Sequence, residues 1–206
     1  MSGELTGLII TRSDKSYNLV RRDENLYFSY YPMLIVYPSN VTDVVNAVNW
    51  GRKQGLNIRC RSGGHNYESF SVGDDVIVID VSNLLNFEID TNEGYVRIGA
   101  GNNLYQLYNR VAKFGFAFVG GSCGSVGVSG ITLGGGVGFL QRQYGLACDN
   151  LIEAQIVDAF GIIITANLYQ NQDLLASLRG AGSNNFGVVV STYYVMRLMK
   201  MVATYH

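Results

Sequence analysis

One glycine-dense stretch constrains this chain of 206 residues more than any other feature. It runs from Gly120 to Gly138, GGSCGSVGVSGITLGGGVG, and nine of its nineteen residues are glycine. No charged residue occurs between Lys113 and Arg142. Because glycine loses the most conformational freedom on folding, such density indicates backbone that turns with positive φ or lies against something large. The stretch also contains a thiol, Cys123.

A second, shorter glycine loop lies upstream. Residues Arg61 to Tyr67 have the sequence RSGGHNY, so an imidazole, His65, follows two glycines. Loops of this kind expose successive backbone N–H groups, which bind phosphate oxygens. We therefore expect the two loops to form the halves of one cofactor site.

The hydrophobic pattern predicts a mixed chain in which strands lead into both loops. Residues 1–31 are polar and aromatic and predict an irregular or helical lead-in, followed by one domain over residues 32–206. The fold class is α+β, with two α/β subdomains that meet near residues 98–103. Ser39 or Asn40 can cap a helix that ends at Gly55. Strands are expected at 33–37, 56–61, 76–79, 95–100, 116–119 and 186–195, a hairpin at 150–158 and 162–166, a turn at 180–185, and further helices at 103–114 and 173–179.

Composition excludes several classes of protein. An apolar fraction of 48% with 15% charged residues is typical of a globular domain. The net charge of −1, without a basic tract, argues against a nucleic-acid partner. The uncharged run 114–141 holds too much Gly, Ser and Thr for a lipid-facing helix, so no membrane span is expected. Residues 1–14 lack an apolar run of signal-peptide length, which predicts a cytoplasmic protein.

The two loops fit no common nucleotide motif. A P-loop needs a lysine after its last glycine, and no lysine occurs between Lys113 and Lys200. Gly99-Ala100-Gly101 matches a Rossmann fingerprint poorly, because Leu104 stands where the third glycine belongs. What remains is a dinucleotide or another phosphorylated cofactor held by unorthodox loops.

The two reactive side chains also have plainer interpretations. His65 could simply bond to nearby backbone, and a lone cysteine such as Cys123 is often inert core. A zinc site could combine these two with Cys60 and Cys148, but none of the four has the short C-x-x-C spacing of a structural site. The glycine setting of His65 and Cys123 favours a ligand-facing role over all three alternatives.

These residues resemble a known family. Arg61–Tyr67 resembles the RSGGHxY loop of the berberine bridge enzyme-like flavoproteins, within the larger vanillyl-alcohol-oxidase group and its PCMH-type FAD-binding domain. Cys123–Gly130 is similar to the CxxVGVxG loop of that family. Three more blocks follow in family order, at Leu133–Gly138, Tyr144–Asn150 and Leu178–Gly187.

The resemblance implies FAD bound covalently, with His65 on the flavin 8α-methyl and Cys123 on C6. It implies that backbone groups of Ser62, Gly63 and Gly64 hold the pyrophosphate. Double attachment fixes the ring and raises its redox potential, which suits oxidation of alcohols, sugars or related amines by hydride transfer to flavin N5. The other cofactor-binding residues that it implies are Arg61, Asn66, Tyr67, Ser125, Val126, Gly127, Gly130, Gly134, Gly136, Gly138, Tyr144, Asn150 and Val189.

The sequence departs from the family in two ways. Ile131-Thr132 stands where many members have histidine or tyrosine, and Cys148 replaces a usual alanine. Family enzymes continue with a substrate domain that carries the catalytic base, whereas this sequence stops at His206, so no catalytic residue is assigned. We expect the FAD-binding portion of an oxidase for a small-molecule substrate, with a missing substrate domain or self-association. The alternatives are a stand-alone flavin-binding module without turnover and a non-catalytic protein without cofactor.

Overall fold

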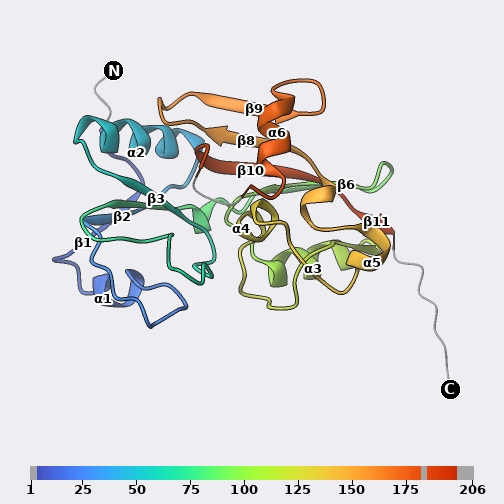
Figure 1. Ribbon diagram of the computed structural model, residues 1–206, viewed down its shortest axis with the longest axis horizontal. Coiled ribbons are helices and arrows are strands. Elements are labelled where there is room, and N and C mark those ends of the chain that lie inside the picture. Colours follow the sequence, from blue (N-terminus) through green and yellow to red (C-terminus); the bar gives the residue numbers. More distant parts are fainter. Residues whose placement is uncertain (1–3, 182–184, 199–206) are drawn as a thin grey trace.

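A computed structural model describes residues 4–181 and 185–198 of the chain. Two β-sheets lie side by side and share one hydrophobic core (Figure 1). The turn expected at 180–185 lies partly outside the described residues, and residues 199–206 lie wholly outside them.

The first sheet has the strand order β1-β2-β4-β3. β2 (Leu34–Tyr37), β4 (Ile77–Asp80) and β3 (Ile58–Arg61) are parallel, and β1 (Leu8–Thr11) pairs antiparallel with β2. The predicted lead-in therefore contains an edge strand, because the short run Leu-Ile-Ile gains its hydrogen bonds only from the distant β2. The short helix α1 (Tyr17–Val20) follows it.

Both faces of the first sheet are covered, which explains its continuous apolar strands. Val36, Ile77 and Ile79 face the main core. Ile35 and Val78 face a smaller cluster with Val72 and Val76 on the opposite side. Alternate residues of one strand thus serve two cores.

Helix α2 (Val41–Lys53) joins the two sheets, since it contacts β4 in the first sheet and β8 and β10 in the second. Its boundaries confirm the prediction. The Asn40 side chain accepts a hydrogen bond from the Asp43 backbone N–H at 3.0 Å, and Gly55 has a φ of +67° just past the end of the helix.

The second sheet is antiparallel with the order β5-β6-β10-β8-β9. Its strands are β5 (Phe87–Asp90), β6 (Tyr95–Gly99), β10 (Val188–Val195), β8 (Leu151–Val157) and β9 (Ile163–Asn167). The predicted β8–β9 hairpin is confirmed, whereas β5 was not expected from the sequence. The change between sheets falls between Asp80 and Phe87, across the 3₁₀ turn η1 (Val81–Asn83), earlier than the expected boundary near residues 98–103. Helix α6 (Gln172–Leu178) packs on β8 and β9.

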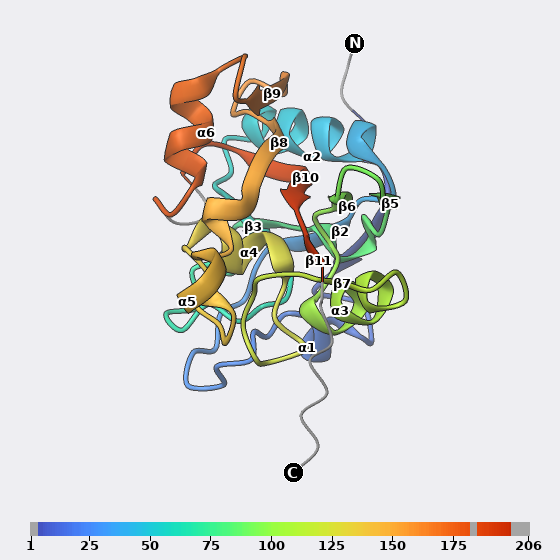
Figure 2. The same cartoon turned by 90° about the vertical axis from the view of Figure 1, so that its right-hand side faces the viewer.

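The glycine-dense stretch follows α3 (Leu104–Ala112), which Asn103 and Gln106 cap reciprocally, and the short β7 (Phe116–Ala117), which pairs with β11 (Arg197–Leu198). The stretch contains α4 (Val128–Leu133), a helix that its glycine content concealed. Two short elements come after it, α5 (Gln141–Tyr144) and η2 (Cys148–Asn150). Figures 1 and 2 both place α4 beside β3, so the glycine-dense stretch reaches back to the first sheet.

No helix within the described ranges is long and apolar enough to cross a membrane.

Candidate functional site

The two glycine loops meet at the junction between the sheets. A Cβ atom added to Gly63 would overlap the Gly127 backbone nitrogen, and one added to Gly127 would overlap the Ser62 hydroxyl. The Ser62 hydroxyl in turn donates to the Ala100 carbonyl at 2.8 Å. Glycine at both positions therefore lets two backbones touch, and the expected contact between the loops is present.

The start of α3 fixes the downstream loop. The Leu104 N–H donates to the Val126 carbonyl at 3.0 Å, and the Tyr105 N–H donates to the Gly124 carbonyl at 2.9 Å. The Val128 N–H donates to the Asn102 carbonyl at 2.9 Å. The first-turn N–H groups of a helix lack partners within the helix. Carbonyl groups of the loop accept from two of them, and these hydrogen bonds hold the loop in a fixed position on α3.

The two predicted nucleophiles converge on one hydroxyl. His65 Nε2 lies 2.8 Å from Ser125 Oγ, and Cys123 Sγ lies 3.5 Å from the same oxygen. Cys123 and Ser125 are exposed and His65 is half-buried, so a ligand can reach all three. Imidazole nitrogen and thiolate sulfur are both good nucleophiles. The structure thus places an imidazole and a thiol from distant parts of the sequence at one accessible point.

The upstream loop also presents free backbone donors. Among the described residues, the N–H groups of Gly63, Gly64 and His65 have no hydrogen-bond partner. Gly64 has a φ of +67°, and its carbonyl accepts from the Glu24 N–H at 3.0 Å. Consecutive unpaired N–H groups on a turning loop suit an anionic oxygen of a phosphate. This part of the site fits the pyrophosphate of FAD.

Arg61 plays a different part from its neighbours. Its guanidinium is buried, with Nε 2.6 Å from Asp80 Oδ2 and Nη2 donating to the Val20 carbonyl at 2.7 Å. Asp80 ends β4 directly beside Arg61 at the end of β3. The ion pair therefore ties the start of the loop to the sheet beneath it, and the Arg61 guanidinium is occupied by contacts within the protein.

A second carboxylate, that of Asp23, lies near the Arg61 guanidinium but accepts no hydrogen bond from it. Asp23 Oδ1 is 3.7 Å from Arg61 Nη1, and the Asp23 side chain is fully buried. Neither of its oxygens has a hydrogen-bond partner among the described residues. Burial, opposed by the charge of Arg61, raises the pKa of Asp23 to about 6. The packing of Asp23 against Gly64 puts this carboxyl directly under the loop.

The remaining predicted glycines divide into packed and open positions. A Cβ at Gly136 would overlap Ala147, and one at Gly138 would overlap the Gly120 carbonyl, so both are needed for protein packing. At Gly130 a Cβ would meet nothing within 4 Å, and at Gly134 it would make only ordinary contacts. Both residues are exposed. They leave an open face on α4 that a flat cofactor could approach.

Other predicted residues contribute to the protein's own hydrogen bonds. The buried Asn150 amide donates to the Tyr144 and Leu146 carbonyls and accepts from Arg197. Asn66 accepts from the N–H groups of Glu68 and Phe70, which shapes the turn after His65. Val189 is buried in β10, Val126 is half-buried against the core, and Tyr67 is 86% exposed. Of these, only Tyr67 offers a free aromatic side chain.

Sequence reasoning missed two members of the site, Asp23 and Asp80. For Asp80 a signal existed, because an acidic residue ending one apolar parallel strand and an arginine ending the next must meet at one edge. No local pattern marks Asp23. Within the described residues no group of three or more His, Cys, Asp or Glu side chains could hold a metal ion.

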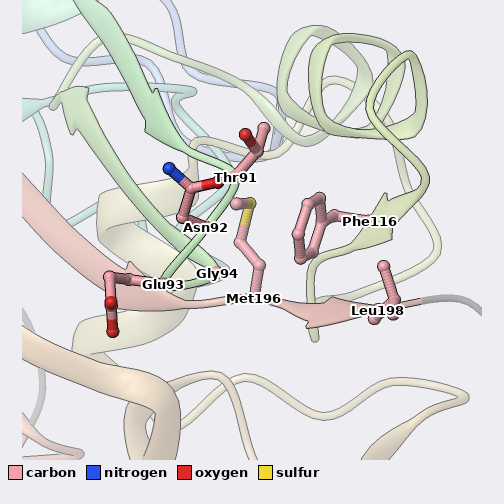
Figure 3. Close-up of a pocket in the computed structure, with 7 residues that line it drawn as sticks. All are labelled: Thr91, Asn92, Glu93, Gly94, Phe116, Met196 and Leu198. Atoms are coloured by element: carbon pink, nitrogen blue, oxygen red, sulfur yellow. The ribbon is translucent and has the colours of Figure 1, made fainter.

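A hollow of about 270 Å³ lies elsewhere, beside the turn between β5 and β6. In Figure 3 the Met196 side chain extends alongside the Phe116 ring, whereas the Glu93 carboxylate points away from both. Its remaining lining is Thr91, Asn92, Gly94 and Leu198. None of the predicted site residues lines it, and it holds no nucleophile beside a base.

Fold and site together define an FAD-binding domain. Residues 32–167 match the family described as FAD binding domain, and the chain belongs to that family. It is 36% identical over 192 residues to the FAD-linked oxidoreductase YgaK of Bacillus subtilis. This alignment covers 91% of this chain and 43% of the relative. It is 38% identical over 170 residues to berberine bridge enzyme-like 23 of Arabidopsis thaliana, covering 80% and 32%.

Among solved structures, 6-hydroxy-D-nicotine oxidase from Arthrobacter nicotinovorans superposes with a TM-score of 0.92 at 34% identity, covering 95% of this chain and 43% of the oxidase. The predicted PCMH-type FAD-binding fold and the resemblance to the berberine bridge enzyme-like FAD-linked oxidoreductases are confirmed. The chain spans less than half the length of these relatives.

Proposed function

We propose that this chain binds FAD through two covalent bonds, one from His65 and one from Cys123, as the flavin-binding part of an oxidase. The observation that carries the proposal is the convergence of both nucleophiles on Ser125, at 2.8 and 3.5 Å. The two residues are 58 positions apart in the sequence, and a ligand shared by both loops would give their meeting a chemical purpose.

The chain's own groups divide the task of holding the cofactor. The N–H groups of Gly63, Gly64 and His65 would hold the pyrophosphate, because they are consecutive and unpaired. The open positions Gly130 and Gly134 would admit the flat part of the cofactor along α4. The buried ion pair of Arg61 with Asp80 keeps the upstream loop in place during binding.

Bound FAD supplies the hydride chemistry, and the protein supplies position and electrostatics. We propose a substrate with an oxidisable CH–OH or CH–N bond, an alcohol, a sugar or a related amine. The catalytic base would come from a substrate domain outside this sequence. Val137, which is 65% exposed, lies in the glycine-dense stretch, and Phe139, which is 90% exposed, follows it directly. Such a domain would cover both side chains.

An absorbance spectrum before and after acid precipitation tests the attachment. Flavin should stay with the pellet in the wild-type chain and in either single variant, His65→Ala or Cys123→Ala, since one bond remains. The double variant should release all flavin to the supernatant. Cys148→Ala is the matched control, because Cys148 is buried in η2 and should leave attachment unchanged.

Two results would contradict the proposal. Flavin that stays in the pellet with the double variant would mean that other residues form the bonds. If the wild-type chain binds FAD but releases all of it on precipitation, the chain is still an FAD-binding domain, but the proposed covalent bonds do not form. For the substrate class, anaerobic bleaching of the flavin band by alcohols, sugars or amines is the measurement, made on a chain that includes the substrate domain.

A further inference from the structure

We propose that Ser125 is a positioning residue that joins Cys123 and His65 into one proton path. Along this path the Cys123 thiol loses its proton and becomes a nucleophilic thiolate, while His65 gains a proton. The purpose of this path rests on the covalent attachment proposed above. Its existence does not, because it can be measured in the chain without flavin.

The geometry follows from what a hydroxyl can do. A serine hydroxyl has one hydrogen to donate and can accept two hydrogen bonds. Ser125 Oγ has two neighbours in reach, Cys123 Sγ at 3.5 Å and His65 Nε2 at 2.8 Å. One arrangement satisfies all three groups when Nε2 is the unprotonated nitrogen. The thiol donates to the hydroxyl oxygen, and the hydroxyl hydrogen points to the imidazole.

The proton transfer balances along this line. The S–H bond of Cys123 breaks, and its proton joins Ser125 Oγ while the hydroxyl proton of Ser125 moves to His65 Nε2. The products are a thiolate and an imidazolium, with the hydroxyl restored and no electrons exchanged. Because the imidazolium has no free lone pair, only one of the two residues is a nucleophile at a time. The inference therefore implies that the two bonds form in sequence.

Few other groups can perturb this path. The charged residues around the upstream loop are Arg21, Arg22, Asp23 and Glu24 on the segment packed against it, Arg61 at its start and Glu68 just after it. The Arg21 guanidinium is directed to the Tyr30 carbonyl and the Tyr31 ring, and Arg22 and Glu68 are exposed. Asp23 and Arg61 are buried and face each other, and Glu24 is exposed. On the other side the Gly124 backbone packs against Tyr105. Ser125 is thus the only group that bridges His65 and Cys123 within the described residues.

The thiol chemistry of Cys123 can be read without interference from the other cysteines. Burial raises the pKa of the Cys60 thiol to about 12 and also raises the pKa of Cys148. Both thiols are therefore protonated and slow near neutral pH, since the thiolate is the reactive form. Cys123 is the exposed cysteine of the three.

The experiment measures alkylation of Cys123 by iodoacetamide across pH 5 to 9, in full chain produced under riboflavin limitation so that it carries no flavin. An ordinary thiol is only a few per cent thiolate at neutral pH, so we expect Ser125→Ala and His65→Gln each to slow alkylation at pH 7 by about tenfold or more. The wild-type rate should stay high at neutral pH, whereas in both variants it should climb steadily with pH. Ser125→Thr keeps a hydroxyl and should keep most of the wild-type rate.

Each outcome decides the question. A Ser125→Ala chain with the wild-type rate and pH profile overturns the proposal, and so does a His65→Gln chain with both unchanged. If Ser125→Ala does not fold by circular dichroism, His65→Gln and the conservative Ser125→Thr carry the test. Acid precipitation of flavin-loaded wild-type chain is scored separately, so loss of covalent attachment would not be mistaken for loss of the proton path.

Discussion

Arg61 and His65 stand four residues apart in one loop motif, yet they occupy opposite environments. The Arg61 side chain is buried and lies 2.6 Å from Asp80, whereas His65 turns outward to an exposed serine at 2.8 Å. Ser62, Gly63 and Gly64 separate the two, and the positive φ of Gly64 turns the chain between them. One half of the motif holds the loop in place, and the other half presents a nucleophile beside an exposed hydroxyl.

The difference shows why a motif should not be interpreted residue by residue as ligand contacts. Ionised side chains are buried only when paired, so an arginine at 6% exposure beside a carboxylate is a structural element. A histidine and a cysteine beside one hydroxyl at the surface have no packing role to fill. Substitution of Arg61 should therefore lower stability, whereas substitution of His65 or Cys123 should change thiol and flavin chemistry.

The largest effect is expected from Arg61→Ala. It leaves Asp80 buried without its partner, and losing one member of a buried pair costs about 3–5 kcal/mol. His65→Ala, the matched change in the outward half, should alter the free energy of unfolding by less than about 0.5 kcal/mol. Urea unfolding of both variants checks this. Equal losses from the two substitutions would mean that Arg61 and His65 contribute alike to stability.

The next effect concerns pH and the buried Asp23. Its pKa of about 6 in the folded chain lies above the ordinary value of 3.8, so the folded state holds this proton more tightly than the unfolded state. Stability should therefore fall as pH rises from about 4 to about 6, and no further above that. The loss is on the order of 1–3 kcal/mol.

Asn at position 23 cannot ionise, so the substitution Asp23→Asn should remove this fall in stability between about pH 4 and pH 6. Thermal unfolding between pH 4 and pH 7.5 is the measurement. A wild-type profile that rises over this interval, with the variant following it, would mean that Asp23 ionises normally despite its burial. Cys123 alkylation should respond far less to this substitution than to Ser125→Ala.

The smallest effects come from a matched pair of glycines. Gly127→Ala forces a methyl group into the Ser62 and Gly63 contact and should cost about 1–3 kcal/mol, as overpacked positions do. Gly130→Ala adds a methyl to open space within α4 and should leave stability unchanged or raise it by up to about 1 kcal/mol. If the cofactor approaches along α4, Gly130→Ala should nevertheless lower the flavin content. Unfolding curves and the ratio of flavin to protein absorbance separate the two effects.

Local patterns determined much of this protein. Asn40 and Gly55 marked both ends of α2, and the segment from Leu56 to Arg61 predicted the strand that delivers the loop. The spacing of glycine, histidine and cysteine indicated a phosphorylated cofactor, and five blocks in order pointed to the family. These features are local because capping, alternation and turns depend on residues within a few positions of each other.

Tertiary structure decided the rest. β1 becomes a strand only because β2 lies beside it, and α4 forms within glycine-rich sequence because its residues Val128 and Leu133 are buried in the shared core. The meeting of His65 with Ser125 and the burial of Asp23 against Arg61 join residues 60 and 38 positions apart. No single-sequence pattern encodes such pairs, since they depend on how two sheets pack. The sequence specified which groups could react, and the packing of the sheets determined which of them meet.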